Sequence, residues 1–91
     1  MVLKIEKVPD GPETVLRLSG RIESEQVQEL KTQISRIAQS IVLDLEQVRL
    51  VDLDAVHFLA VCETKGIELR RCPPYVREWI LVEKSRISEF E

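Results

Sequence analysis

Residues 41–45, IVLDL, decide the fold because they are almost continuously apolar. A short run of this kind, without polar alternation until its end, is typical of a central β-strand that is covered on both faces. A helix is expected to begin shortly afterwards, near Asp52, and to stop at Lys65 and Gly66, since glycine favours the end of a helix. A buried strand followed by a helix indicates an α/β protein.

The segment before this strand contains two further strands and one helix. Residues 2–8 alternate between apolar and polar side chains, and PDGP at 9–12 predicts a turn into a second strand over 14–19 that ends at Gly20. From Ser24, the expected N-cap, apolar residues recur at helical spacing. The residues of this apolar stripe are Val27, Leu30, Ile34 and Ile37.

The segment after residue 66 predicts one more strand and one more helix. Residues 67–72 alternate, and Pro73-Pro74 opens a helix that carries Val76, Trp79 and Ile80 inward. Tyr75 and Trp79 are expected to pack together on the sheet. The whole order predicts a mixed sheet of four to five strands with α-helices packed against it.

Length and composition indicate one globular domain over residues 1–91, in which 83–91 form a weakly patterned tail whose Ile87 and Phe90 either dock or fray. The net charge of −3 makes nucleic acid an unsuitable partner. No apolar run reaches the length of a membrane span, and the first residues alternate, unlike a signal peptide. We therefore expect a cytoplasmic protein without membrane insertion, in which Cys62 and Cys72 are reduced thiols in or near the core.

Four segments in this order resemble the STAS domain family of bacterial anti-sigma factor antagonists, over nearly the whole chain. They are residues 18–23 (LSGRIE), similar to the family's Gly-x-Leu-Asp segment; the strand 41–45; Val51-Asp52, which opens the family signature; and the return 66–69 (GIEL). The resemblance implies a STAS-like fold and a non-catalytic, protein-binding regulatory role in signal transduction.

The sequence departs from the family at the signature itself. The family pattern, Asp-Ser-Ser-Gly or close to it, contains the serine or threonine that a partner kinase phosphorylates; here Asp52 is followed by Leu53, Asp54 and Ala55. Asp54 holds the phosphoacceptor-equivalent position and cannot be phosphorylated as a serine or threonine. A carboxylate supplies less charge than phosphoserine, about −1.5 to −2, so Asp54 mimics the phosphorylated form only in part. Asp54 is either a plain helix-start residue or one that also shapes a binding surface.

The resemblance implies a partner-binding surface at the start of the second predicted helix and in the loop before the first. The candidate residues are Gly20, Arg21, Glu23, Asp52, Leu53, Asp54, His57 and Phe58. For Leu53 the sequence favours packing against the helix or core over an exposed contact. His57 is expected to be a surface or partly buried histidine, because no second histidine or cysteine stands at ligand spacing, so no metal is implied.

The sequence carries no motif that points to catalysis. It lacks a phosphate-binding loop and a nucleophile elbow, and it has one histidine to serve as a base near neutral pH, so we expect neither an enzyme nor a bound cofactor. The partner implied by the resemblance is an anti-sigma-type serine kinase. The alternative is a structural accessory subunit that binds the ATPase of an ABC-type lipid transporter. The oligomeric state stays open.

Overall fold

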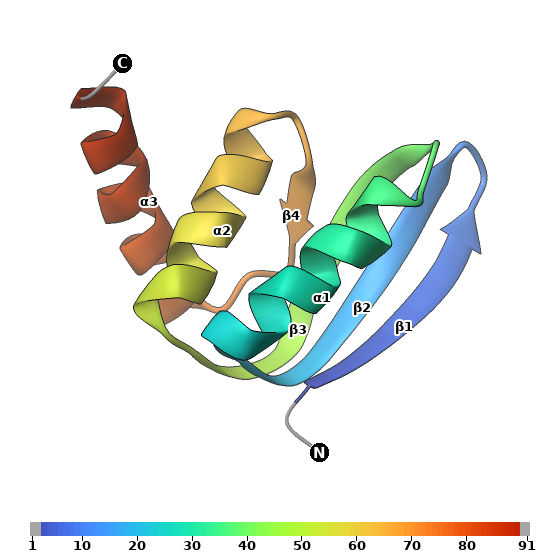
Figure 1. Cartoon of the computed structure of the whole chain (residues 1–91), viewed down its shortest axis with the longest axis horizontal. Helices are drawn as coiled ribbons and strands as arrows, with labels where there is room; N and C mark the ends of the chain where they lie inside the picture. The colour runs from blue at the N-terminus through green and yellow to red at the C-terminus, as the bar shows by residue number, and fades with distance from the viewer. Residues whose placement is uncertain (1–2, 90–91) are drawn as a thin grey trace.

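The computed structural model describes residues 3–89, with side chains described through residue 87. Strands and helices follow one another in the predicted order (Figure 1). They are β1 (Leu3–Asp10), β2 (Glu13–Ile22), α1 (Ser24–Ser35), β3 (Ser40–Val51), α2 (Leu53–Thr64), β4 (Glu68–Arg70) and α3 (Pro74–Glu89).

The strands form a four-stranded mixed sheet in the order β1-β2-β3-β4, which confirms the predicted fold class. β1 and β2 make an antiparallel hairpin, whereas β2 pairs with β3, and β3 with β4, in parallel. Parallel neighbours need a crossover connection, and α1 and α2 provide the two crossovers. The strand predicted to be central, residues 41–45, lies within β3 and has a neighbour on each side.

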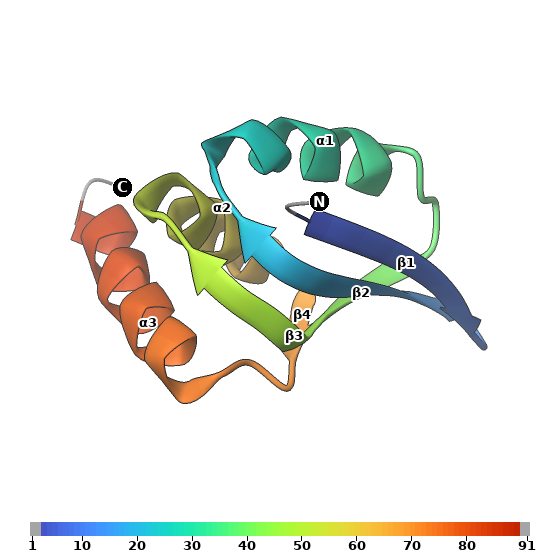
Figure 2. The same cartoon turned by 90° about the horizontal axis from the view of Figure 1, so that it is seen from below.

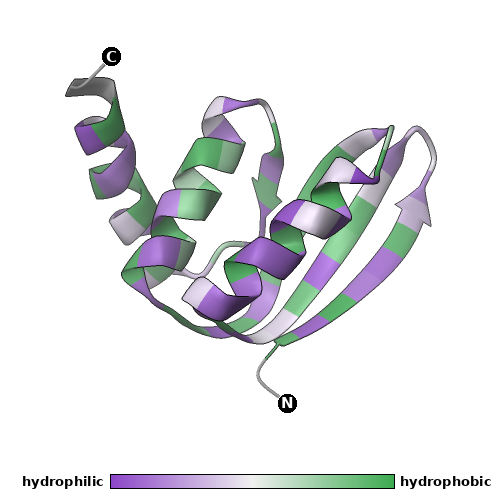
Figure 3. Ribbon diagram, in the orientation of Figure 1, coloured by the Kyte–Doolittle hydropathy of each residue, from purple (hydrophilic) through white to green (hydrophobic). Residues whose placement is uncertain are grey.

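One hydrophobic core lies between the sheet and the helices. α1 and α2 cover one face of the sheet, and α3 packs against α2 beside the end of β3 (Figure 2). In each strand every second side chain points to the helices. Along β1 the apolar and polar positions alternate accordingly (Figure 3). The fully buried core side chains include Leu16, Leu18, Leu43, Leu45, Leu30, Leu59, Val76 and Ile80.

β2 continues past the glycine that was predicted to end it. Gly20 has φ +100°, and the pairing of β2 with β3 shifts register on either side of this region, between Arg17 and Ser19 and between Gly20 and Arg21. A glycine at positive φ accommodates a bulge that a side chain would resist, so the strand bends and continues to Ile22 instead of stopping. The predicted stop at Gly20 was wrong for this reason.

The start of α1 also differs from the prediction. The N-cap is Glu23, whose backbone N–H donates to Gln26 Oε1 at 3.1 Å, in the manner of a capping box. Ser24 is the first helical residue, so the prediction of Ser24 as the cap was wrong by one position. β4 is shorter than the predicted strand 67–72 and covers three residues.

α3 buries the expected apolar face but not its two aromatic residues. Val76 and Ile80 are fully buried, whereas Trp79 is 37% exposed and Tyr75 49% exposed. The Tyr75 hydroxyl donates to the carbonyl oxygen of Arg49 on β3 at 2.7 Å, so Tyr75 reaches the sheet at the surface. The inward position predicted for Trp79 was wrong. The helix includes most of the predicted tail, and Ile87 packs against the core. Phe90 lies outside the described residues.

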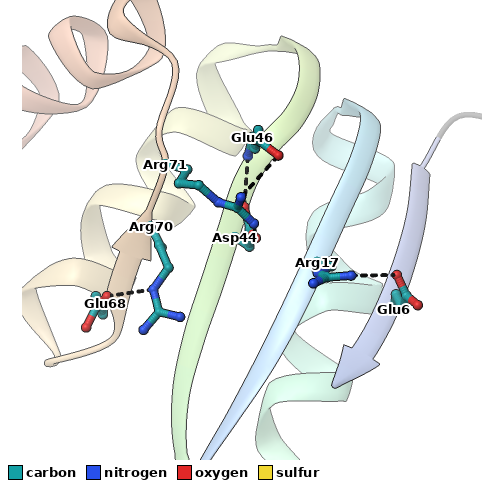
Figure 4. Close-up of polar contacts among 7 residues, drawn as sticks. All are labelled: Glu6, Arg17, Asp44, Glu46, Glu68, Arg70 and Arg71. Atoms are coloured by element: carbon teal, nitrogen blue, oxygen red, sulfur yellow. Dashed lines mark hydrogen bonds and ion pairs between the residues drawn. The ribbon is translucent and has the colours of Figure 1, made fainter. Parts of the chain in front are cut away.

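The sequence predicted that both faces of the central strand are covered. The sheet face opposite α1 and α2 instead carries charged side chains and no helix among the described residues (Figure 4). Asp44 is 4% exposed and accepts a hydrogen bond from the guanidinium of Arg71, which also pairs with Glu46 at 3.3 Å. Glu6 and Arg17 form a second pair across β1 and β2, 3.9 Å apart. This layer explains how an aspartate is tolerated inside a central strand.

Burial would raise the pKa of Asp44, because a charged carboxylate is poorly solvated there. The hydrogen bond from Arg71, a backbone N–H from Glu46 and the charges of Arg71 and Arg17 act in the opposite direction and prevail. The pKa of Asp44 therefore lies below its ordinary value, and the carboxylate is ionised at neutral pH.

Candidate partner-binding surface

Asp52 joins the beginnings of α1 and α2 through one carboxylate. Its Oδ1 accepts from the backbone N–H of Ala55 at 2.9 Å, which caps α2. Its Oδ2 accepts from the backbone N–H of Ser24 at 2.8 Å, in the first turn of α1. Two free N–H groups at two different helix starts are thus satisfied by the same side chain. Asp52 acts first as a structural residue that fixes the two helix starts relative to each other.

The backbone brings the two predicted segments of the surface together. β2 and β3 are parallel neighbours that end side by side, with Ile22 paired to Val51. The backbone N–H of Asp52 donates to the carbonyl oxygen of Ile22 at 3.2 Å. Gly20, Arg21 and Glu23 on one segment therefore lie at the same end of the sheet as the start of α2, as the resemblance implied.

The exposed part of this surface is made by four of the eight candidate residues. Arg21, Asp54 and His57 are exposed, and Leu53 is 51% exposed. The prediction that Leu53 packs into the helix or core was therefore wrong. Its neighbours Ala55 and Val56 occupy the inward positions of the first turn instead.

Phe58 supports the candidate surface from the hydrophobic core. Its side chain is 7% exposed and belongs to the hydrophobic core. Gly20, Glu23 and Asp52 are half-buried, and Glu23 and Asp52 cap the two helices. These residues fix the shape of the site, and the exposed residues provide most of the area that another molecule would meet.

Asp54 stands in the first turn of α2 and forms no hydrogen bond or ion pair with any residue whose side chain the structure describes. Negative charge is favoured there by the partial positive charge of the helix start, by about 0.3–1 kcal/mol. Because Asp52 already supplies the cap, the Asp54 carboxylate is left directed at solvent. Its oxygens remain available to a donor on another molecule.

His57 contacts a carboxylate that the sequence analysis did not include in the site. Its Nδ1 lies 3.0 Å from Oε2 of Glu83 on α3, and Arg86 pairs with the other oxygen of Glu83 at 3.3 Å. Glu83 is 7% exposed. The signal for it was a glutamate at an inward position of the last helix, in register with Val76 and Ile80, which requires a polar partner inside the fold.

Between residues 3 and 89, no three histidine, cysteine, aspartate or glutamate side chains are grouped so as to hold a metal ion. None of the helices in that range is long and apolar enough to cross a membrane.

Comparison with known proteins shows similarity in three dimensions and not in sequence. No family model matches the chain, and no curated protein matches it. Among solved structures, the anti-sigma factor antagonist SpoIIAA in its unphosphorylated form aligns with a TM-score of 0.65 and 17% identity, over 91% of this chain and 81% of that one. An anti-sigma factor antagonist STAS domain from Rhodobacter sphaeroides aligns with a TM-score of 0.52 and 23% identity, over 75% of this chain and 80% of that one.

A third similar structure belongs to a much larger protein. The crystal structure of Mglu aligns with a TM-score of 0.62 and 17% identity, over 76% of this chain. This chain spans 19% of the length of that protein. At these identities the similarity concerns the fold, since one fold supports different functions.

Proposed function

We propose that this chain, which has the STAS-like fold, is a non-catalytic regulatory module of the cytoplasm that binds a protein partner through the start of α2. Two solved structures of anti-sigma factor antagonists share the fold, which supports a regulatory role of this type. The observation that carries the proposal is the exposure of Leu53 and Asp54 on a helix start that Asp52 holds in place.

Leu53 and Asp54 combine the two features that a protein contact needs. The exposed leucine offers apolar area to remove from water, at about 25 cal/mol per Å². The adjacent carboxylate, free of partners within the described side chains, offers a charged acceptor that selects a donor on the partner. Because the helix start is already ordered, binding costs little conformational entropy on this side.

The same geometry bears on how the module is controlled. Asp54 places a carboxyl group where the resembling family places a phosphorylatable hydroxyl. Serine phosphorylation at this position is chemically impossible, so we propose that the module is constitutive or is controlled by another route. The partner we propose is a serine kinase of the anti-sigma type.

Affinity capture from the native lysate tests this proposal, with a Leu53→Ala, Asp54→Ala double variant compared with wild type. The matched control is Leu81→Ala, Asp10→Ser, which removes a leucine of similar exposure, 53%, on α3 and an exposed aspartate in the β1–β2 hairpin. Recovery of a serine-kinase-type ATPase by wild type and control, with at least tenfold less on the double variant, supports the proposal. Equal recovery by all three proteins contradicts it.

The identity of the captured ATPase separates the two roles implied by the sequence. Adding the captured kinase and ATP to an Asp54→Ser variant should place phosphate on residue 54, and wild type should stay unlabelled. Recovery of the ATPase of an ABC-type lipid transporter instead, with no phosphate on either protein, would replace the regulatory role by that of an assembly subunit.

A further inference from the structure

A groove of about 760 Å³ lies between α1 and α2, and residues of both helices line it. Its apolar lining comes from Val27 and Ile34 on α1, Phe58 and Val61 on α2, and Ile67 just before β4. Buried Cys62 contributes to the same wall. The volume falls within the range of about 300–1,000 Å³ that is typical of small-molecule sites.

Two lysines line the groove toward the end where both helices finish. The helix starts are joined through Asp52, and the helices run in the same general direction (Figure 1), so Lys31 and Lys65 lie toward the same end. Both ammonium groups also act on the same thiol. Burial raises the pKa of Cys62 to about 11, while the charges of Lys65 and Lys31 oppose that rise.

Neither lysine is neutralised by the described part of the protein. No ion pair is formed by Lys31 or Lys65 with any side chain described through residue 87, whereas Lys84 and Arg77 both pair with Glu63, at 3.1 and 2.8 Å. No acidic residue stands three or four positions from Lys31 or Lys65 within its helix. Lys65 follows the last residue of α2, where the negative end of the helix favours a cation, and Lys31 is an exposed residue just before the last turn of α1.

The opposite end of the groove carries a negatively charged side chain, that of Asp54. Asp54 and His57 line it where the two helices begin. The groove is therefore polarised along its length, with an apolar middle, a carboxylate at one end and two ammonium groups at the other. From Phe58 to Lys65 the helix rises by about 10 Å, at 1.5 Å per residue.

We propose that this groove binds a small amphipathic carboxylate, with its head between Lys31 and Lys65 and its hydrocarbon body along Val27, Phe58 and Val61. A carboxylate between two ammonium groups gains charge-assisted hydrogen bonds, and the hydrocarbon is removed from water by the apolar wall. The charge at the Asp54 end repels the same head and so fixes the direction of binding. This ligand site does not depend on the partner-binding function, and each can fail without the other.

Decanoate, held below its micelle-forming concentration, is the probe for this site. In two-dimensional NMR titrations of the full chain we expect saturable shifts of α1 and α2 amides that line the groove. Decylammonium, with the same chain and the opposite charge, should bind at least tenfold more weakly. The Lys31→Gln, Lys65→Gln double variant should lose at least tenfold in affinity for decanoate, and Lys31→Arg, Lys65→Arg should retain it.

Lys7→Gln is the matched control, because Lys7 is exposed on β1 and away from the groove, and its affinity should equal that of wild type. These substitutions change exposed side chains, so unfolding does not complicate the result. Absence of saturable binding to wild type overturns the proposal. Equal affinity for decanoate and decylammonium, or an unchanged affinity in the glutamine double variant, also overturns it.

Discussion

At the scale of single residues, Asp52 has the widest influence, since it satisfies N–H groups at the starts of both α1 and α2. Asp52→Ala removes both acceptors and should lower the free energy of unfolding by about 2 kcal/mol, at roughly 1 kcal/mol per helix cap. Asp52→Asn keeps one acceptor and should cost about half as much. Urea denaturation monitored by circular dichroism measures these values.

Asp54→Ala is the control for that measurement. Asp54 lies two residues away, is exposed and has no side-chain partner among the described residues, so its removal costs only the favourable charge at the helix start, about 0.3–1 kcal/mol. Equal destabilisation by Asp52→Ala and Asp54→Ala would contradict the role assigned to Asp52.

The two cysteines should differ in reactivity. Burial raises the pKa of Cys62 to about 11, so about one thiol in a thousand is ionised at pH 8, and only 5% of the residue is exposed. Burial raises the pKa of Cys72 as well, but that residue is half-buried. We expect iodoacetamide to alkylate native Cys72 at least tenfold faster than Cys62, as followed by mass spectrometry. Equal rates would mean that the region around Cys62 opens readily.

The sequence predicted part of the candidate site at this scale. Asp52 was recognised as the first residue of the signature and as the start of a helix. Its bond to Ser24 was not predicted, because it joins residues 28 positions apart and depends on how two helices pack. The exposure of Leu53 was missed for a similar reason: the pattern of one helix does not show which of its apolar residues finds a covering neighbour.

At the scale of elements, Gly20 determines how β2 reaches the site. A non-glycine residue at φ +100° is strained, so Gly20→Ala should destabilise the protein by about 1–2 kcal/mol. The same substitution should shift the bulge and so change the position of Arg21. Ser19→Ala, the neighbouring half-buried position, is the control and should cost less than about 1 kcal/mol. Thermal denaturation compares the two, and a neutral Gly20→Ala would show that the bulge is not strained.

Periodicity predicted the elements better than their boundaries. The apolar run 41–45 and the helical spacing of residues 27–34 depend on the core, which is the strongest determinant of this fold. The end of β2 and the cap of α1 depend on local backbone geometry, which the sequence expresses weakly. Gly20 was predicted to end β2 at a turn, but its positive φ belongs to a bulge within the strand, and glycine is favoured in both features.

At the scale of the whole molecule, the charged side chains on the sheet face opposite α1 and α2 should make stability depend on pH. The pKa of Asp44 lies below its ordinary value in the folded state. Its ionised form therefore contributes stability above the unfolded pKa, about 3.9, and this contribution is lost as the pH falls through the folded value. Asp44→Asn should cost about 2 kcal/mol at pH 7 and progressively less as the pH falls below about 4.

Urea titrations across this range measure the difference in the free energy of unfolding between wild type and Asp44→Asn. The other carboxylates titrate in both proteins, so their contribution cancels in this difference. Arg71→Gln removes the main partner of Asp44 and should abolish much of the same pH dependence. A deficit that stays constant from pH 7 to pH 2 would contradict the ionised pair.

The arrangement of the whole fold places the candidate surface and the charged sheet face on different sides of the molecule. The surface lies where β2 and β3 end and both helices begin, and the ion pairs lie on the face opposite these helices. Substitutions in the ion-pair layer should therefore change stability without changing partner affinity.

The most direct test of the account is the affinity of the purified partner for the chain, measured by isothermal titration calorimetry. The Leu53→Ala, Asp54→Ala variant should bind at least tenfold more weakly than wild type, a loss of about 1.4 kcal/mol. The Leu81→Ala, Asp10→Ser control should match wild type. If the variant at the start of α2 binds as tightly as wild type, the partner does not use this surface and the central claim is wrong.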